Sequence, residues 1–428
     1  MSIMKKFIFI YLVLFNGFAS AAIFQVDLTV LDLIDDNPGD GVCDIPTGGF
    51  CTLRAAVMEA NALPGPDIIV LPGDATIRLT ITGSGENSAA TGDLDITDAV
   101  VIGTFIEPTA SFPTIDANEL NDRVFHVLSG SGLVTFVNFR VINGSADFGN
   151  GGAINISLDN QVVVNRVWFE DNTADSGGAI YLSPQSDLDV VDSVFTGNAA
   201  VSRGGALTVF GTAQVDKSSV FDNLNFNTGF QEAIYVGKNT LGADGFVLRN
   251  STVFDNSESG IVAVAADLRI RNSTIAFHSN RGVVSNPDDD ITPDLRIQNS
   301  IFNGNSQNCG TGVVNKVTDN WNITSDSNFC YEVSPGQDST TLTEDPKLTS
   351  LKVDAENWHR YYRPGFFSPV VDSAHPTAPG PGIGCDLEDQ RGVVRPQDAG
   401  NDGNDRCDRG AIELLEDVIF FDDLDIQY

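Results

Sequence analysis

The feature that most constrains the fold of this chain is a short internal repeat. The tripeptide GGA begins at Gly151, Gly177 and Gly204, so its copies start 26 and 27 residues apart. A second mark is Phe followed within three residues by Asn, and it begins at Phe169, Phe195, Phe221, Phe254, Phe277 and Phe302. A third mark, NST or NSI, begins at Asn250, Asn272 and Asn299. Self-similarity at a period of roughly 20–50 residues indicates an architecture of stacked repeats.

The segments between these marks are short and alternate in polarity. In DLDV, Leu188 and Val190 share one side of the chain, and Asp187 and Asp189 share the other. A period of two predicts half-buried strands. Regular turns also occur in a β-sandwich, but a sandwich has no reason to repeat at about 25 residues. A coil of three short strands has that length, so we predict an all-β fold, a single-stranded right-handed parallel β-helix of the pectate-lyase type, over residues 115–350.

Stacked coils give each mark a physical role. Neighbouring strands lie about 4.8 Å apart, so every residue sits above its equivalent in the next coil. Gly-Gly is expected where a turn needs a positive φ or close backbone approach, with Ala as a small inward residue beside it. Phe is expected to stack on Phe in the interior. Asn is expected to adopt the left-handed conformation and to form ladders of side-chain amides.

The two ends of such a solenoid expose strand edges unless they are covered. The stretch CTLRAAVMEANALPG predicts a short amphipathic capping helix with Thr52 as its N-cap. We therefore expect an N-terminal cap and first strands at 22–114 and an irregular, disulfide-bearing C-terminal cap at 351–414. An acidic and aromatic tail follows at 415–428.

The N-terminus predicts export. Residues 1–21, MSIMKKFIFIYLVLFNGFASA, combine a basic flank, an apolar run and a small-residue end, which are typical of a secretory signal peptide. We expect a secreted protein, extracellular or at the outer-membrane surface of a bacterium. No later segment approaches the ~18 apolar residues of a membrane span, so no transmembrane segment is expected in the mature chain. The formal net charge of -34 argues against nucleic acid as a partner.

Six cysteines occur as three close pairs in the sequence: Cys43 and Cys51, Cys309 and Cys330, and Cys385 and Cys407. An even number in an exported chain predicts disulfides. Metal binding is the alternative, but the chain has no C-x-x-C spacing. Sequence does not fix the connectivity, and pairing between sequence neighbours is the working hypothesis.

Several stretches resemble families of exported bacterial proteins. GDGVCD, CTLRAAVMEAN and DIIVLPGD, within about residues 24–80, resemble the CSLREA domain. DPKL, SPVVDSA, DQRGVVRPQ and CDRGAIEL, within about residues 345–414, resemble the choice-of-anchor Q region. The GGA and Phe–Asn repeats resemble those of polymorphic outer-membrane proteins, which are surface adhesins. These resemblances imply an exported, surface-exposed protein, and none supplies a catalytic residue.

Two groups of residues are candidate ligand contacts. Arg269 and Arg271 alternate on one predicted strand and Arg296 follows on the next, which predicts a basic row for an acidic sugar. The alternative is a set of outward residues balanced by neighbouring Asp. The second group lies in ENWHRYYRPGFF, where an exposed aromatic platform would suit sugar stacking and packing over the last coil is the alternative. Its candidate residues are Trp358, Tyr361 and Tyr362.

Two loops rich in Asp and Gly are candidate calcium sites. The first offers Asp36, Asp40 and Asp44, and the second offers Asp398, Asn401, Asp402, Asn404 and Asp405. Calcium takes six to eight oxygen ligands, which such loops can supply. Neither loop has the acidic twelfth residue of a helix-flanked calcium loop, and solvated turns are the alternative.

The sequence favours adhesin-like, non-enzymatic binding of a polysaccharide, matrix or host surface. A calcium-assisted polysaccharide lyase or a glycoside hydrolase is the alternative, and a passive structural or biofilm component is a third hypothesis. Glycoside hydrolysis requires two carboxylates at a defined separation, but Asp is so abundant here that no pair stands out. No catalytic residue is therefore assigned.

Overall fold

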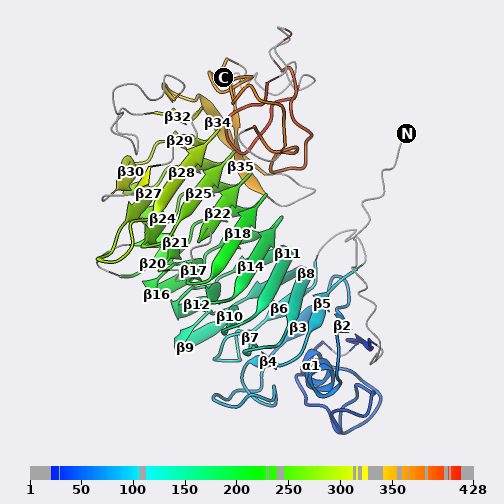
Figure 1. Cartoon of the computed structure of the whole chain (residues 1–428). Helices are drawn as coiled ribbons and strands as arrows, with labels where there is room; N and C mark the ends of the chain where they lie inside the picture. The colour runs from blue at the N-terminus through cyan, green and yellow to red at the C-terminus, as the bar shows by residue number, and fades with distance from the viewer. Residues whose placement is uncertain are drawn as a thin grey trace, which may run out of the picture.

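The computed structural model describes residues 21–415, except 28, 106–111, 228, 230, 239–244, 312–314, 317–320, 326–340, 354–358, 366, 381–383, 400–402 and 404–405. Parallel strands stack along one axis from the N-terminal to the C-terminal end (Figure 1). Their apolar residues form one continuous core from Phe24 to Cys309. The predicted parallel β-helix is confirmed. The predicted signal peptide and almost all of the predicted tail lie outside the described residues.

The largest sheet has twenty strands among the described residues, arranged in two columns. The first column contains β1 (Ile23–Gln25), β2 (Asp67–Val70), β5 (Val100–Gly103), β8 (Leu133–Ile142), β11 (Gln161–Glu170), β14 (Asp187–Val191), β18 (Thr212–Asp216), β22 (Phe246–Arg249), β25 (Leu268–Arg271), β28 (Asp294–Gln298) and β31 (Asn315–Lys316). The second contains β3 (Thr76–Arg78), β6 (Thr114–Asp116), the C-terminal halves of β8 and β11, β15 (Val194–Thr196), β19 (Ser219–Phe221), β23 (Thr252–Phe254), β26 (Thr274–Ala276), β29 (Ile301–Asn303), β32 (Ile323–Thr324) and β33 (Leu342–Thr343).

Further sheets complete each coil. The nine-stranded sheet contains β4 (Leu94–Ile96), β7 (Phe125–Val127), β10 (Ile154–Ile156), β13 (Ile180–Leu182), β17 (Leu207–Val209), β21 (Glu232–Val236), β24 (Ser259–Val264), β27 (Arg281–Asn286) and β30 (Gln307–Thr311). The four-stranded sheet contains β9 (Ser145–Asn150), β12 (Thr173–Ser176), β16 (Ala199–Arg203) and β20 (Leu224–Asn225). Outside the solenoid, β34 (Leu348–Val353) and β35 (Arg360–Pro364) form an antiparallel pair.

A stacked corner joins the two columns. At this corner a residue with positive φ recurs in coil after coil: Asn138, Arg166, Asp192, Lys217, Asn250, Asn272 and Asn299. The Asn of the NST mark therefore takes the predicted left-handed conformation, with φ of 46° at Asn250 and 44° at Asn272. The Ser that follows bridges coils, because Ser251 Oγ accepts a hydrogen bond from Ser218 N at 3.0 Å. The third mark is thus a corner of the solenoid.

The GGA marks form a second stacked corner. Gly177 has a φ of 67°, which an L-residue rarely adopts. At Gly178 a Cβ would lie 2.1 Å from Gly205 O of the next coil, so only glycine fits. Ala179 is fully buried beside it. Both predicted reasons for Gly-Gly, positive φ and close approach, are confirmed, one at each position.

A ladder of buried side chains runs through six consecutive coils, at the position that follows the second column. It consists of Asn172, Asn198, Asn223, Asn256, His278 and Asn305. Asn198 Nδ2 donates to Asn223 Oδ1 at 3.0 Å, and Asn198 Oδ1 accepts from Asn172 Nδ2 at 2.9 Å. The predicted amide ladder is confirmed, but His278 replaces Asn in one coil. Burial lowers the pKa of His278 to about 4, so its ring is neutral and can both donate and accept.

The Phe marks divide into inward and outward sets. Phe169 and Phe195 stack in the core with ring centroids 4.9 Å apart, as predicted. The next mark is one residue shorter, and the register pairs Phe221 with Thr196 instead of Phe195. Because successive strand residues face opposite sides, this shift turns Phe221 outward. Phe221 stacks on Phe254 at 5.0 Å outside the main core, so the predicted interior position is wrong for both.

Residues 359–414, here called the C-terminal segment, cover these outward rings. The Arg360 guanidinium lies 4.7 Å from the centre of the Phe221 ring, and the Tyr362 ring packs edge-on against Phe254 at 5.3 Å. This apolar docking surface exists only because the shorter repeats direct Phe outward.

Polar contacts extend the docking over several coils. Gln390 Nε2 donates to Ser219 Oγ at 2.9 Å, and Thr252 Oγ1 donates to Gln390 Oε1 at 2.6 Å. Two coils beyond Ser219, Ala411 N donates to Thr274 Oγ1 at 3.3 Å. The C-terminal segment therefore runs along the flank of the coils and also reaches the last ones, where Val370 packs against Ile301 and Ile323. Tyr362 of the aromatic stretch packs on this flank and not over the last coil. In Figure 1 it lies beside the upper coils.

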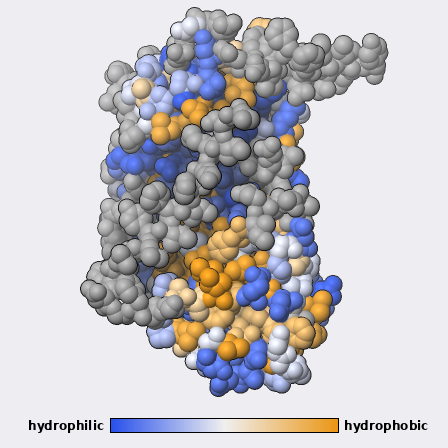
Figure 2. All heavy atoms as spheres, turned by 90° about the vertical axis from the view of Figure 1, so that its right-hand side faces the viewer, coloured by the Kyte–Doolittle hydropathy of each residue, from blue (hydrophilic) through white to orange (hydrophobic). Residues whose placement is uncertain are grey.

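The N-terminal cap follows the prediction closely. Helix α1 (Leu53–Ala62) begins after Thr52, whose Oγ1 accepts from Ala55 N at 3.1 Å, and it lies at the end of the solenoid against β2 and β4 (Figure 1). The fully buried Arg54 is paired with Asp32 at 2.7 Å. Hydrophobic residues gather toward this end of the face shown in Figure 2. No helix among the described residues has the length and hydrophobicity to span a membrane.

Two predicted disulfides are present, Cys43–Cys51 in the N-terminal cap and Cys385–Cys407 in the C-terminal segment. Cys309 is also disulfide-bonded. Cys330 lies outside the described residues, so the third predicted pair stays a prediction.

We predict that the amide ladder is a major source of stability. Asn198→Ala removes buried partners of Asn172 and Asn223, and each buried polar group left unsatisfied costs about 1–3 kcal/mol. We expect chemical denaturation to show a loss of about 3 kcal/mol. The control is Asn165→Ala, at a half-buried outward position on the neighbouring coil, which is expected to change stability by about 0.5 kcal/mol. Equal losses in both variants would contradict the role of the ladder.

Candidate functional site

The outward face of the first column carries a straight row of residues. The strand register aligns Val163, Asp189, Gln214, Val247, Arg269 and Arg296, here called the central row. At about 4.8 Å per strand the row is roughly 24 Å long. The chemical character of the row changes along the axis, from acidic and amide side chains at one end to basic side chains at the other.

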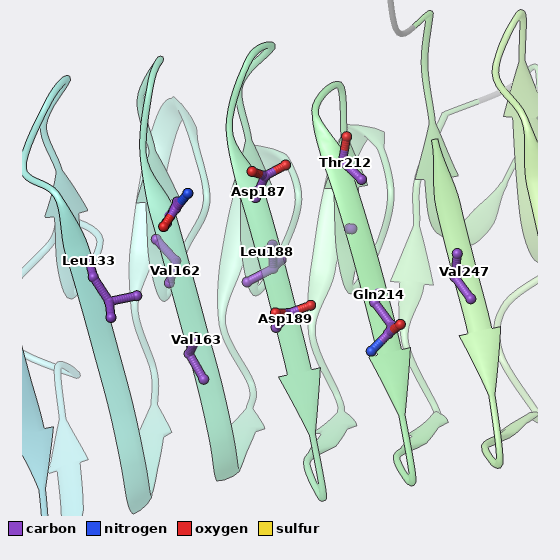
Figure 3. Close-up of a pocket in the computed structure, with 11 residues that line it drawn as sticks. Leu133, Val162, Val163, Asp187, Leu188, Asp189, Thr212, Gln214 and Val247 are labelled. Atoms are coloured by element: carbon purple, nitrogen blue, oxygen red, sulfur yellow. The ribbon is translucent and has the colours of Figure 1, made fainter. Parts of the chain in front are cut away.

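A depression of about 520 Å³ lies over the acidic end of the central row (Figure 3). Its lining residues come from five consecutive strands: Leu133, Gln161, Val162, Val163, Asp187, Leu188, Asp189, Thr212, Ala213, Gln214 and Val247. In Figure 3, Asp189 and Gln214 project from neighbouring strands on the same face. Carboxylate, amide and hydroxyl groups therefore line an open, elongated floor with apolar patches between them.

Charges interact along this face. Partial burial raises the pKa of Asp189, Asp187 raises it further, and the positive charge of Arg249 opposes both effects. Arg249 itself is paired with Asp216 at 3.0 Å. Asp187 and Asp189 are both exposed, so they can accept hydrogen bonds from hydroxyl groups of a ligand.

The predicted arginine row is brought together only in part. Arg269 and Arg296 are register partners on β25 and β28, as predicted. Arg296 is also paired with Asp294 at 3.2 Å, which agrees with the alternative of charge balance by neighbouring Asp. Arg271, however, lies under the C-terminal segment, where it donates to Gly384 O at 3.0 Å and pairs with Asp386 at 3.5 Å. The prediction that Arg271 belongs to an open row of ligand-binding arginines is therefore wrong.

The predicted aromatic platform is a packing surface where it is described. Tyr361 is 9% exposed and packs within the C-terminal segment. Tyr362 packs against Phe254 and lies 4.8 Å from the ring of Phe277. Trp358 lies outside the described residues. Tyr362 therefore attaches the C-terminal segment to the coils, and Tyr361 belongs to the core of the segment itself.

The first candidate calcium loop lies within the described residues, whereas most predicted ligands of the second lie outside them. The Asp36 side chain hydrogen-bonds with that of Asp44, and this contact raises the pKa of Asp36. Asp40 instead accepts from Asn37 Nδ2 and from Val42 N, each at 2.9 Å. In the second loop Asp398 accepts from Gly403 N at 3.0 Å. The other predicted ligands, Asn401, Asp402, Asn404 and Asp405, lie outside the described residues, and calcium at either loop stays a prediction.

The DQRGVVRPQ and CDRGAIEL stretches form a buried network of charges. Arg391 pairs with Asp389 at 2.6 Å, and Arg395 pairs with Glu413 at 3.3 Å. Burial and the neighbouring Glu413 raise the pKa of Asp408 well above its usual value. Each of these charged groups has its partners within the C-terminal segment, so the two stretches stabilise the fold of that segment.

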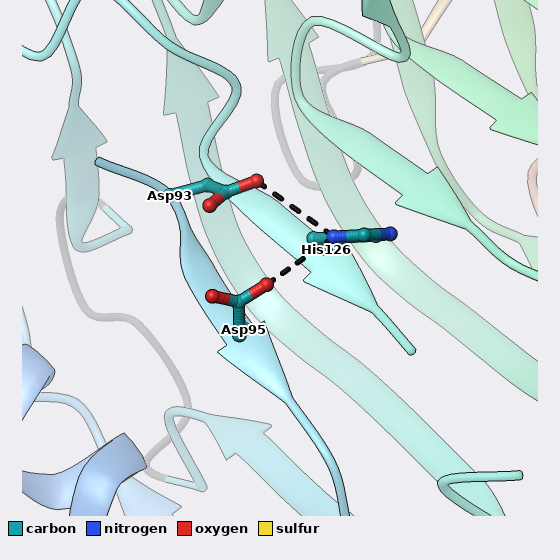
Figure 4. A group of neighbouring side chains, drawn as sticks. All are labelled: Asp93, Asp95 and His126. Atoms are coloured by element: carbon teal, nitrogen blue, oxygen red, sulfur yellow. Dashed lines mark ion pairs between the residues drawn. The ribbon is translucent and has the colours of Figure 1, made fainter. Parts of the chain in front are cut away.

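Sequence reasoning missed a cluster of Asp93, Asp95 and His126 on the nine-stranded sheet (Figure 4). One ligand atom from each lies within 4.8 Å of the other two, and this is the only such group of three among the described residues. Burial and the charges of Asp95 and Asp122 raise the pKa of Asp93 to about 7, against the opposing effect of Arg123. None of the sequence marks includes these residues, and it is the register of β4 and β7 that pairs Asp95 with His126.

A second missed group continues along the same sheet. Tyr181 and Tyr235 flank the ring of Phe210, with centroids 5.8 and 5.9 Å away, and the Arg203 guanidinium lies 4.7 Å from the Tyr235 centroid. Buried Glu232 lies in the same region. Desolvation raises the pKa of Glu232 to about 8, although Gly204 N and Arg203 lower it.

No family model matches the chain. Metabotropic glutamate receptor-like protein Q of Dictyostelium discoideum is 31% identical over 114 residues, which is 24% of this chain and only 9% of that protein. A rhamnogalacturonan lyase structure has a TM-score of 0.39 at 13% identity and covers 71% of this chain and 74% of its own. The Azotobacter vinelandii mannuronan C-5 epimerase AlgE4 A-module has a TM-score of 0.23 at 14% identity and covers 61% and 91%. These partial similarities assign no substrate.

We predict that Glu232 makes the fold less stable as the pH rises. Its pKa is higher in the folded than in the unfolded chain, so its contribution is fully present below the unfolded value of 4.5 and is lost as the pH rises through about 8. Glu232→Gln keeps the acceptor for Gly204 N and removes the titration. Relative to this variant, the wild type should lose on the order of 1–3 kcal/mol between about pH 5 and about pH 8.

Urea denaturation at several pH values measures this difference. Glu119→Gln, which changes an exposed carboxyl group, is the control and should follow the wild-type profile. Parallel profiles for the wild type and Glu232→Gln would contradict the prediction.

Proposed function

We propose that this protein is a secreted, adhesin-like protein that binds an extended polysaccharide along the central row, without chemical change to the sugar. The observation that carries the proposal is the polar floor of the elongated depression on β8, β11, β14, β18 and β22, which the basic residues of β25 and β28 continue along the same row. A cavity with a few convergent polar groups is the first place to expect a ligand.

The spacing of the row suits a polymer. One coil advances about 4.8 Å along the axis, close to the length of one sugar ring in an extended glycan. Successive rings would therefore meet equivalent positions on successive strands. Asp187, Asp189 and Gln214 would accept or donate hydrogen bonds to sugar hydroxyls, and the guanidinium groups of Arg269 and Arg296 would receive acidic groups of the sugar.

Export is part of the same proposal. The two disulfides are consistent with an oxidising compartment, where an exposed polysaccharide or matrix would be met. The resemblances to the CSLREA domain, the choice-of-anchor Q region and the polymorphic outer-membrane repeats support the same location. Calcium bound at the Asp-rich loops belongs to the proposal as a further prediction.

We predict that acidic polysaccharides bind to the central row. Affinity electrophoresis of the mature chain with polygalacturonate, alginate and hyaluronan, beside neutral xylan and dextran, should show retention by at least one acidic polymer. Gln214→Ala and Arg296→Ala should each weaken that binding about tenfold, equivalent to about 1.4 kcal/mol. Added salt should weaken it further, because charged groups are screened.

The matched control is Tyr181→Ala, which removes an aromatic ring from the nine-stranded sheet and should leave the affinity unchanged. Loss of binding in Tyr181→Ala, with no change in Gln214→Ala and Arg296→Ala, would place the ligand on the other sheet and contradict the proposal. Release of unsaturated products or new reducing ends would contradict non-enzymatic binding and favour a lyase or hydrolase.

A further inference from the structure

The Asp93, Asp95 and His126 cluster has the geometry of an ion site. The distance from His126 Nδ1 is 3.2 Å to Asp95 Oδ1 and 4.0 Å to Asp93 Oδ2. Ligand atoms about 2.1 Å from one shared ion lie roughly 3.0–4.2 Å apart, so these atoms need only small shifts to share one. Figure 4 shows both carboxylates directed toward the same edge of the imidazole ring.

Asp95 provides an independent indication. Its side chain is fully buried, and its Oδ1 accepts no hydrogen bond from any described residue although it faces the cluster. Its other oxygen, Oδ2, accepts from Ala89 N at 3.4 Å. A buried carboxylate oxygen without a hydrogen bond is strongly unfavourable unless a cation compensates it.

The ring of His126 is oriented for metal binding. Its Nε2 lies 3.0 Å from Ser157 Oγ, so it can donate its proton to that hydroxyl oxygen. This tautomer leaves the lone pair of Nδ1 directed at Asp93 and Asp95. Metal-bound histidines usually have such a hydrogen bond on the second ring nitrogen, which fixes the tautomer.

The surrounding charges favour a divalent cation. Asp93, Asp95 and Asp122 lie together, and the neighbouring basic group is Arg123, which pairs with Asp93 at 3.0 Å. With all three carboxylates ionised and the imidazole neutral, the three carboxylates and one guanidinium leave two negative charges. Because imidazole suits zinc and related metals better than calcium or magnesium, the ligand set selects a borderline transition metal.

The strand arrangement gives the ion a role. β4 is the terminal strand of the nine-stranded sheet and carries Asp95, whereas His126 belongs to the adjacent β7. The cap holds both β4 and the loop before it, because Asn61 Nδ2 donates to Asp95 O at 2.7 Å and Arg54 donates to Gly92 O at 2.8 Å. An ion between the strands would connect the capped edge to the second coil.

We propose that Asp93, Asp95 and His126 bind one zinc ion or a similar divalent transition metal, which joins β4 to β7 at the N-terminal edge of the nine-stranded sheet. His126 keeps 17% of its side chain exposed, so water can complete the coordination. This site is separate from the central row and does not depend on polysaccharide binding.

The test uses the untagged mature chain after EDTA treatment. Titration with Co²⁺ should produce a visible absorption band with one ion bound per chain, and Zn²⁺ should remove the band by displacement. Zn²⁺ should raise the thermal unfolding midpoint, and the same concentration of Ca²⁺ should not. Asp95→Asn and His126→Gln should lose the band, and Ser157→Ala should weaken zinc binding about tenfold.

Two comparisons separate this site from a structural ion pair. In EDTA, Asp95→Asn should unfold at or above the wild-type temperature, because it removes a buried charge. Asp189→Asn, on the other sheet, should keep the full Co²⁺ band. The proposal is overturned if the wild type gives no Co²⁺ band or if Asp95→Asn keeps the band. It is also overturned if Asp95→Asn unfolds well below the wild-type temperature in EDTA, because that result would show that Asp95 is an ion-pair partner of protonated His126.

Discussion

The structure depends on parallel stacking of equivalent residues in successive coils. Backbone hydrogen bonds join neighbouring strands, and buried side chains that cannot reach water must then find partners in the coil above or below. In the ladder through Asn172, Asn198 and Asn223, each side-chain amide hydrogen-bonds with the side-chain amide of the next coil, so these buried polar groups have partners. A neutral His278 can enter the ladder because imidazole also has one donor and one acceptor.

Departures from the repeat create the features that distinguish one side of the solenoid. A mark one residue shorter turns Phe221 and Phe254 outward, and the C-terminal segment then packs on their rings. The same segment covers Arg271 and leaves Arg269 and Arg296 on the outward face. The extent of the open surface on the first column is therefore set by where the C-terminal segment docks.

The two candidate sites differ in their physical character. The central row is shallow and elongated, and a neighbouring carboxylate such as Asp294 partly compensates its charge, so it suits many weak contacts with a polymer. The Asp93, Asp95 and His126 cluster is compact and largely buried, with a carboxylate oxygen that has no hydrogen bond. Such a cluster suits one strongly held cation.

The solenoid follows from local features of the sequence, because each mark has a local cause: positive φ at Gly177, close approach at Gly178, and a left-handed corner at Asn250. The Thr52 cap and two disulfides were also predictable. Which residues meet between coils depends instead on the packing of the whole chain. Asp95 and His126 are 31 positions apart and belong to no mark, so strand register alone unites them, and the covering of Arg271 required the position of a segment more than 100 residues away.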